Sequence, residues 1–74
     1  MSYRCIFATP YIGDRFYYED WDYYRSFVVV HVTECNVYYE EITPGTPRYG
    51  FAASRVNFMT YAKHRDYHGE HDNA

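Results

Sequence analysis

Cysteine, proline and glycine are all scarce in this chain of 74 residues, which contains 2, 3 and 4 of them respectively. Two cysteines cannot form the disulfide framework that stabilises many small secreted domains. We expect Cys5 and Cys35 to be reduced and buried as small apolar side chains. The alternative is a disulfide between neighbouring strands, because each cysteine lies in a strand-like stretch.

Long hydrophobic runs are also missing. The longest apolar run covers residues 27–30 and is far too short to cross a bilayer. No apolar stretch of the kind found in secretion signals follows Met1. We therefore expect a cytoplasmic, intracellular protein that does not associate with membranes.

Catalytic signature motifs are absent as well. The sequence contains no glycine-rich phosphate loop, dinucleotide fingerprint, nucleophile elbow, HExxH motif or CxxC motif. A chain of this length also leaves little room for a closed active site. We therefore expect a non-enzymatic protein without a cofactor.

Aromatic residues, in contrast, make up 23% of the chain, and 11 of them are tyrosines. Each ring can bury roughly 150–250 Å², so one small core cannot hold them all. Exposed rings at this density indicate a contact surface for another protein or for a second copy, and we expect a homodimer. The alternative is a tyrosine-rich sheet surface without a binding role.

Charge is distributed unevenly along the chain. Residues 1–42 carry a net charge of −4, residues 43–65 carry +4 without any acid, and residues 66–74 carry −3. This pattern favours self-association or docking to a charged protein over bulk attraction to nucleic acid.

The clearest secondary structure is a hairpin. Residues 26–33 are rich in β-branched valine, and the valine run predicts a central strand that is buried on both faces. Residues 37–42 form its partner strand after a turn at 34–36. Residues 3–9 are a further strand, which ends at Pro10.

The remaining segments are less regular. Residues 14–25 are either two aromatic arms around an acidic bend or a short helix capped by Asp14. Residues 43–47 are a loop. Residues 55–67 are predicted to be a helix, with Ser54 as N-cap and Gly69 as its stop.

Together these elements predict the α+β class: a small antiparallel sheet of three or four strands with one C-terminal helix packed on one face. Residues 1–68 would form a single domain, and residues 69–74 a flexible tail.

Residues 14–24, which we call the acidic aromatic segment, are the strongest candidate site. Its carboxylates would steer it toward a basic surface, and its rings would anchor it there. Short, acidic, tyrosine-rich chains resemble in composition some viral inhibitors of host proteins, so we expect a small inhibitor that acts in an infected host cell. The predicted partner-binding residues are Tyr17, Tyr18, Glu19, Asp20, Trp21, Asp22, Tyr23 and Tyr24.

Two alternatives use the C-terminal half. Residues 48–65 combine four cations with aromatic rings, which is typical of sites for single-stranded nucleic acid. His64 and His68 would lie one turn apart on a helix and, with His71, could bind zinc or nickel. The same histidines could act as acid and base in a ribonuclease-like enzyme.

Overall fold

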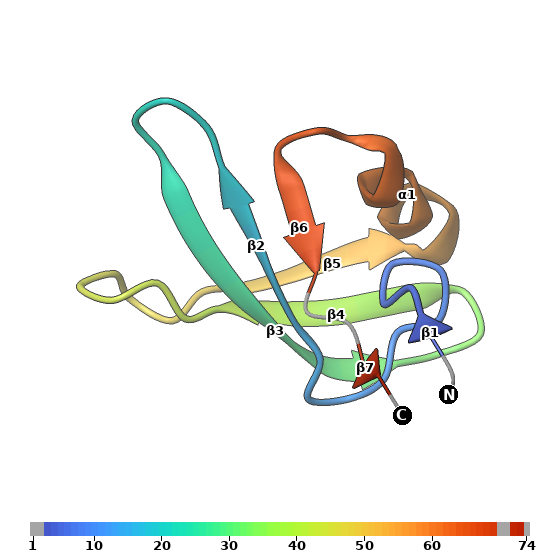
Figure 1. Cartoon of the computed structure of the whole chain (residues 1–74). Helices are drawn as coiled ribbons and strands as arrows, with labels where there is room; N and C mark the ends of the chain where they lie inside the picture. The colour runs from blue at the N-terminus through green and yellow to red at the C-terminus, as the bar shows by residue number, and fades with distance from the viewer. Residues whose placement is uncertain (1–2, 70–71, 74) are drawn as a thin grey trace.

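The computed structural model of the chain describes residues 3–69 and 72–73, and its main feature is an antiparallel sheet (Figure 1). The strand order is β5-β4-β3-β2-β6. A separate two-stranded sheet pairs β1 (Tyr3–Arg4) with β7 (Asp72–Asn73). The strands of the main sheet are β2 (Arg15–Glu19), β3 (Tyr24–Val32), β4 (Asn36–Glu41), β5 (Gly50–Ser54) and β6 (Tyr67–Gly69).

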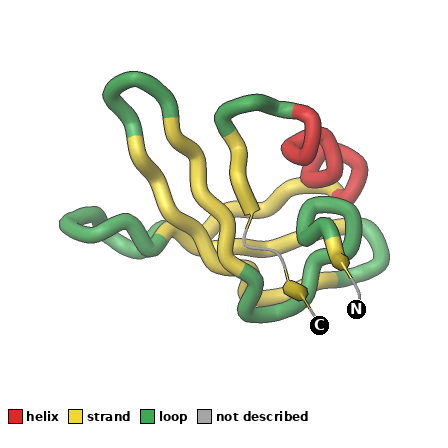
Figure 2. The backbone as a smooth tube through the Cα atoms, viewed as in Figure 1, coloured by secondary structure: helices red, strands yellow, loops and turns green. Residues whose placement is uncertain are grey.

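One short helical segment joins β5 to β6 and lies at one corner of the molecule (Figure 2). It consists of α1 (Arg55–Thr60) and the 3-10 turn η1 (Tyr61–Lys63). The predicted α+β class with a small antiparallel sheet and one helix near the C-terminus is confirmed. The predicted strand count is wrong, since the main sheet has five strands rather than three or four.

Strand β3 is the middle strand, as its valine run predicted, and its hairpin with β4 is confirmed. The register shifts between Val29 and His31, so Val30 is the extra residue of a β-bulge. Only Val29 of the three valines is fully buried, at 1% exposure, while Val28 and Val30 are partly buried on the opposite face.

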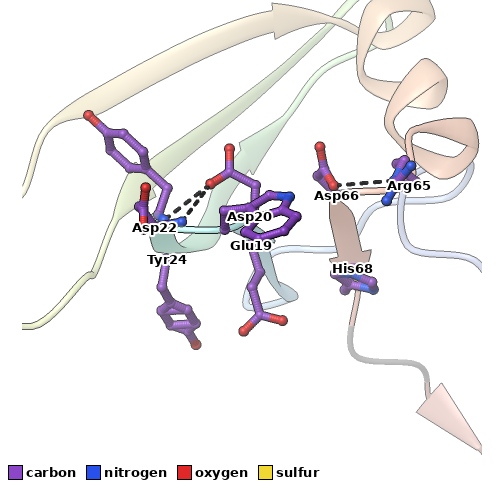
Figure 3. A pocket seen from close by; sticks show the side chains of 9 residues that line it. Glu19, Asp20, Asp22, Tyr24, Arg65, Asp66 and His68 are labelled. Atoms are coloured by element: carbon purple, nitrogen blue, oxygen red, sulfur yellow. Dashed lines mark hydrogen bonds and ion pairs between the residues drawn. The ribbon is translucent and has the colours of Figure 1, made fainter.

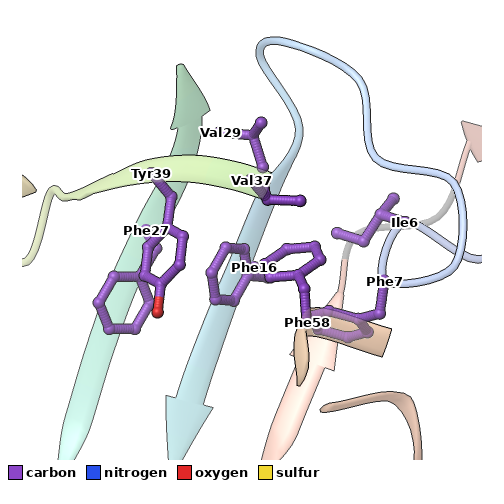
Figure 4. Close-up of a cluster of buried hydrophobic side chains, with 8 residues drawn as sticks. All are labelled: Ile6, Phe7, Phe16, Phe27, Val29, Val37, Tyr39 and Phe58. Carbon is purple, nitrogen blue, oxygen red and sulfur yellow. The ribbon is translucent and has the colours of Figure 1, made fainter. Parts of the chain in front are cut away.

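The core lies on one face of the sheet and is largely aromatic (Figure 4). Phe16 is at its centre, with its ring centroid 5.0 Å from that of Phe27 and 5.3 Å from that of Phe58. Strand alternation selects Val37 and Tyr39 from β4 for this face. The buried hydrophobic residues are Ile6, Phe7, Phe16, Phe27, Val29, Val37, Tyr39 and Phe58.

A buried carboxylate continues this inward-facing series. Glu41 is only 4% exposed, and Arg25 donates to it from Nε at 3.1 Å and from Nη2 at 3.0 Å. Thr43 Oγ1 donates a third hydrogen bond at 2.8 Å. These bonds outweigh the effect of burial and hold the pKa of Glu41 below its usual value of 4.5.

The predicted strand over residues 3–9 is wrong beyond Arg4. Backbone N–H groups of Ala8 and Thr9 both donate to the Cys5 carbonyl, at 3.1 and 2.9 Å, and make a tight turn. The turn buries the consecutive residues Ile6 and Phe7 in the same core. A strand would have placed Ile6 and Phe7 on opposite faces, so the burial of both residues in one core rules out the extended form.

The predicted helix over residues 55–67 is too long. Ser54 is its N-cap, as expected, and Oγ accepts the Asn57 N–H at 3.1 Å. The chain then leaves the helical form at His64 and enters β6. In this position the Tyr67 ring stacks on that of Tyr61, with centroids 4.2 Å apart.

Gly69 is therefore not a helix stop. It is the last residue of β6, and a Cβ there would lie 2.7 Å from Ile6 Cγ1 and 2.8 Å from Ile6 Cδ1. The expected tail from residue 69 thus starts with a residue of the sheet, and Asp72–Asn73 pair with Tyr3–Arg4. Both cysteines are free; Cys5 is half-buried, but Cys35 is exposed, which contradicts its predicted burial.

Candidate functional site

The acidic aromatic segment is a hairpin, which confirms the first of its two predicted forms and excludes the helix. Strand β2 pairs with β3 from Arg15 opposite Val28 to Glu19 opposite Tyr24. The intervening residues 20–23 form a tight turn, closed by a hydrogen bond from the Asp20 N–H to the Tyr23 carbonyl at 3.0 Å. The turn therefore stands at the free end of the hairpin, away from the core (Figure 1).

Asp20 organises this turn. Its Oδ1 accepts the backbone N–H groups of Tyr23, at 3.1 Å, and of Asp22, at 3.3 Å. Its Oδ2 accepts the Tyr18 hydroxyl at 3.0 Å, and this bond raises the pKa of Tyr18. Two-residue hairpin loops usually need positive φ angles, but no described residue other than glycine has one. The Asp20 carboxylate therefore satisfies the N–H groups that the backbone leaves without a partner.

Asp14, at the base of the hairpin, is also a structural acid. Its carboxylate accepts hydrogen bonds from the Arg4 guanidinium and, at 2.7 Å, from the Tyr11 N–H. Burial acts to raise the pKa of Asp14, but these hydrogen bonds outweigh it and the pKa lies below its usual value. Glu19 and Asp22, in contrast, make no side-chain hydrogen bond or ion pair within the described residues, so their carboxylates are available to a partner.

The rings at the tip are exposed. Trp21 is 98% exposed, Tyr23 64% and Tyr24 50%. Trp21 is the only tryptophan of the chain, and a side chain of this size usually buries most of its surface. A full indole therefore stands in water on a hydrogen-bonded turn.

The tip borders a shallow hollow of about 610 Å³ between the hairpin and the chain that leads into β6 (Figure 3). A backbone hydrogen bond of 2.9 Å from Glu19 N–H to the Asp66 carbonyl joins the two sides. The lining carries four carboxylates and one guanidinium, so its charge is strongly negative. The hollow is lined by Glu19, Asp20, Trp21, Asp22, Tyr23, Tyr24, Arg65, Asp66 and His68.

Sequence reasoning missed Arg65 and Asp66 as members of this site. They reach it because β6 pairs with β2, with Tyr67 opposite Tyr18. Arg65 is exposed, and its Nε lies 3.8 Å from Asp66 Oδ1. No local signal marks this pairing, because β6 is only three residues long and about fifty residues from β2 in the chain.

Strand alternation separates the two remaining predicted site residues from the hollow. Tyr17 faces away from the core and stacks on His68, with ring centroids 5.0 Å apart. Tyr18 faces the core side, and its ring centroid lies 5.1 Å from that of Tyr67. The hollow therefore contains Glu19 to Tyr24 of the predicted set, without Tyr17 and Tyr18.

The histidines do not form the predicted helical pair. His64 follows η1, and its Nδ1 accepts the Asp66 N–H at 3.2 Å. His68 lies on β6, so no helix turn relates the two residues. His71 lies outside the described residues. Among the side chains of residues 4–69, no group of three or more histidines, cysteines, aspartates or glutamates could hold a metal ion.

The rings and cations of residues 48–65 do not share one surface. Phe58 is fully buried, and Phe51 and Tyr61 pack against the core. Arg48 forms an ion pair with Glu40, and Arg55 donates to the Thr33 carbonyl at 3.3 Å. Within this segment the core thus uses most of the rings that a nucleic acid would need for stacking.

No family model matches this chain, and no curated protein or solved structure is significantly similar to it. In the part of the chain that the structure describes, no helix has the length and apolar character needed to cross a membrane.

Proposed function

We propose that this protein is a non-enzymatic interaction module, acting as a small inhibitor, that docks its hairpin tip onto a basic site of another protein. The observation that carries the proposal is Trp21, which is 98% exposed at the end of a turn held by Asp20. Tryptophan is enriched among the residues that dominate binding energy at protein interfaces.

The turn limits the entropy lost on binding. Asp20 accepts three hydrogen bonds, two of them from the backbone of the turn. A pre-ordered turn with a rigid aromatic side chain loses little conformational freedom when it binds. The tip is therefore suited to enter a partner's groove without rearrangement.

The hollow beside the tip indicates the chemistry of the partner. The Glu19 carboxylate and the exposed ring of Tyr24 extend to the same side of the hairpin (Figure 3), and the Asp22 carboxylate also lines the hollow. A guanidinium or ammonium group gains both from ion pairs with carboxylates and from contact with aromatic faces. We expect the partner to present arginine or lysine to this hollow, and the surplus negative charge to speed association.

Trp21 also provides the assay, because it is the only tryptophan and lies at the proposed contact. The probes are synthetic arginine- and lysine-rich peptides, titrated while indole emission is recorded at wavelengths where tyrosine is not excited. We expect a blue shift on binding and an affinity that falls with salt. In a labelled-peptide format, Trp21→Ala should weaken binding by about 2 kcal/mol, or about thirtyfold.

The matched charge variants are Asp22→Lys, at the tip, and Glu34→Lys, an exposed acid in the turn at the other end of β3. Both change the net charge equally. We expect Asp22→Lys to slow association at low salt and Glu34→Lys to have little effect. Equal effects of the two variants, or peptide binding that survives Trp21→Ala unchanged, would refute the proposal.

The alternatives make different predictions in the same format. A nucleic-acid site on residues 48–65 predicts salt-sensitive binding of a single-stranded oligonucleotide that Trp21→Ala leaves intact. A histidine site predicts that zinc or nickel binds and that His64→Ala and His68→Ala each abolish this binding.

A further inference from the structure

The face of the sheet opposite the core is the most unusual surface of the molecule after the hairpin tip. Ile6, Phe7 and Phe58, which cover the sheet, all belong to the core face (Figure 4). Val28 and Val30 lie on the other face and are only partly buried. A valine run with apolar residues on both faces is typical of a strand that is buried on both sides. On the face opposite the core, however, no described element packs over these valines.

Aromatic rings extend this open face across four strands. The Tyr17 ring on β2 lies 5.7 Å from that of Tyr24 on β3 and stacks on His68 of β6. Farther along the same face, His31 and Tyr38 are 5.9 Å apart. These rings and the two valines form a mixed aromatic and aliphatic surface, the kind that packs in sheet-on-sheet interfaces.

The charges on this face are arranged in a way that suits a copy of itself. Arg15 and Glu19 are the two ends of β2, both exposed, and neither side chain forms an ion pair with a side chain of residues 4–69. They are equally far from Tyr17, two residues on either side. At about 3.3 Å per residue, opposite charges therefore stand about 13 Å apart around a central ring.

We propose that this open face is a homodimer interface in which two sheets pack face to face. The two-fold axis lies between the sheets, perpendicular to β2 and close to Tyr17. This symmetry makes the two β2 strands antiparallel and brings Arg15 of each copy opposite Glu19 of the other. An isologous interface needs such self-complementary charges, whereas the hairpin tip has mainly negative charge and would repel its own copy.

The dimer does not rest on the proposed docking role. Residues 20–23 begin three residues from Tyr17, so the axis places the two hairpin tips at opposite ends of the dimer. Both Trp21 side chains stay in water, but Glu19 and Tyr24 belong both to this interface and to the hollow beside the tip, so we expect dimerisation and partner binding to compete for these two residues. A dimer without peptide binding, or peptide binding by a monomer, would therefore separate the two proposals.

The test is the mass of the full chain by analytical ultracentrifugation, from micromolar to millimolar concentration. We expect a reversible equilibrium between 9.0 kDa and twice that mass. Arg15→Glu places like charges opposite each other at both ends of the interface and should raise the dissociation constant about tenfold or more. Glu19→Arg should have the same effect.

The double variant Arg15→Glu/Glu19→Arg should restore dimerisation, because it exchanges the charges and preserves their complementarity. Glu34→Arg, outside this face, is the control and should leave the equilibrium unchanged. Unchanged far-UV circular dichroism would show that the variants are folded. A wild-type chain that stays at 9.0 kDa, or a double variant no better than the single ones, would overturn the proposal.

Discussion

Substitution of Gly69 by alanine gives the most direct test of how β6 packs on the core. An added Cβ would lie 2.7 and 2.8 Å from two side-chain atoms of Ile6 and 3.3 Å from Phe7 Cε2. Ordinary carbon contacts are about 3.5–4.0 Å, so Ile6 would have to move by about 1 Å. Ile6 is fully buried and Phe7 is 4% exposed, so the side chains that would have to move are both part of the packed core.

Overpacking of this kind destabilises a core by about 1–3 kcal/mol. Replacing glycine also reduces the conformational entropy of the unfolded chain, which stabilises the folded state by about 0.4–1 kcal/mol where the backbone tolerates alanine. We therefore expect Gly69→Ala to lower the free energy of unfolding by about 1–2 kcal/mol. For a domain of this size, each kcal/mol lowers Tm by about 4–8 °C.

Gly50→Ala is the matched control. Gly50 is also a strand residue, but nothing lies within 4 Å of its Cβ position. This variant should be neutral or slightly more stable than the wild type. Ile6→Val, which removes Cδ1, should relieve part of the strain, so Gly69→Ala and Ile6→Val together should cost less than the sum of their separate effects, by about 0.5 kcal/mol or more.

Urea unfolding followed by far-UV circular dichroism measures these differences. Indole emission is a poor probe here, because Trp21 is already in water in the folded state. If Gly69→Ala is as stable as Gly50→Ala, then β6 does not approach Ile6 closely, and the placement of Arg65, Asp66 and His68 beside the hairpin tip fails with it.

Three further predictions concern the hairpin and the buried ion pair. Asp20→Ala should lower stability by about 1–2 kcal/mol through the lost hydrogen bonds of the turn, whereas Asp20→Asn, which keeps an acceptor oxygen, should retain most of it; thermal melts would show the difference. Trp21→Ala should change stability by less than about 0.5 kcal/mol, because the ring is exposed, and a larger loss in the same melts would mean that the indole packs. Folding lowers the pKa of Glu41, so its ionised carboxylate stabilises the folded state above the usual pKa of 4.5, and this stabilisation is lost as the pH falls through the lowered pKa of the folded state. Glu41→Gln should therefore be less stable than the wild type at neutral pH. In urea titrations this difference should shrink below about pH 4.5.

Elements with a short-range signal could be predicted well. The β3–β4 hairpin follows from a run of β-branched residues, a turn and a second run within seventeen residues. The cap at Ser54 is likewise local, because its partner Asn57 is three residues away. In both cases the contacts that stabilise the element lie inside the segment from which it was predicted.

The errors fall where a distant contact overrides the local pattern. Residues 5–9 were predicted to continue a strand, yet burial of both Ile6 and Phe7 requires a turn. Residues 64–67 were predicted to be the last turn of the helix, yet pairing of β6 with β2 and the stack of Tyr67 on Tyr61 end the helix before them. The predicted one-turn spacing of His64 and His68 is wrong for the same reason, since it depended on a helix through both residues.

The amino-acid sequence by itself determined that aromatic surface exceeds what one small interior can bury, since 23% of the residues are aromatic in a chain of 74. It also determined where the acids cluster, because charge position along a chain needs no fold. Only the tertiary structure decided which rings stay in water. Strand alternation divides neighbouring side chains between two faces, so Phe16 is at the centre of the core while Tyr17 faces outward. The turn at Asp20 leaves Trp21 exposed, and the pairing of distant strands places Arg65 and Asp66 beside it.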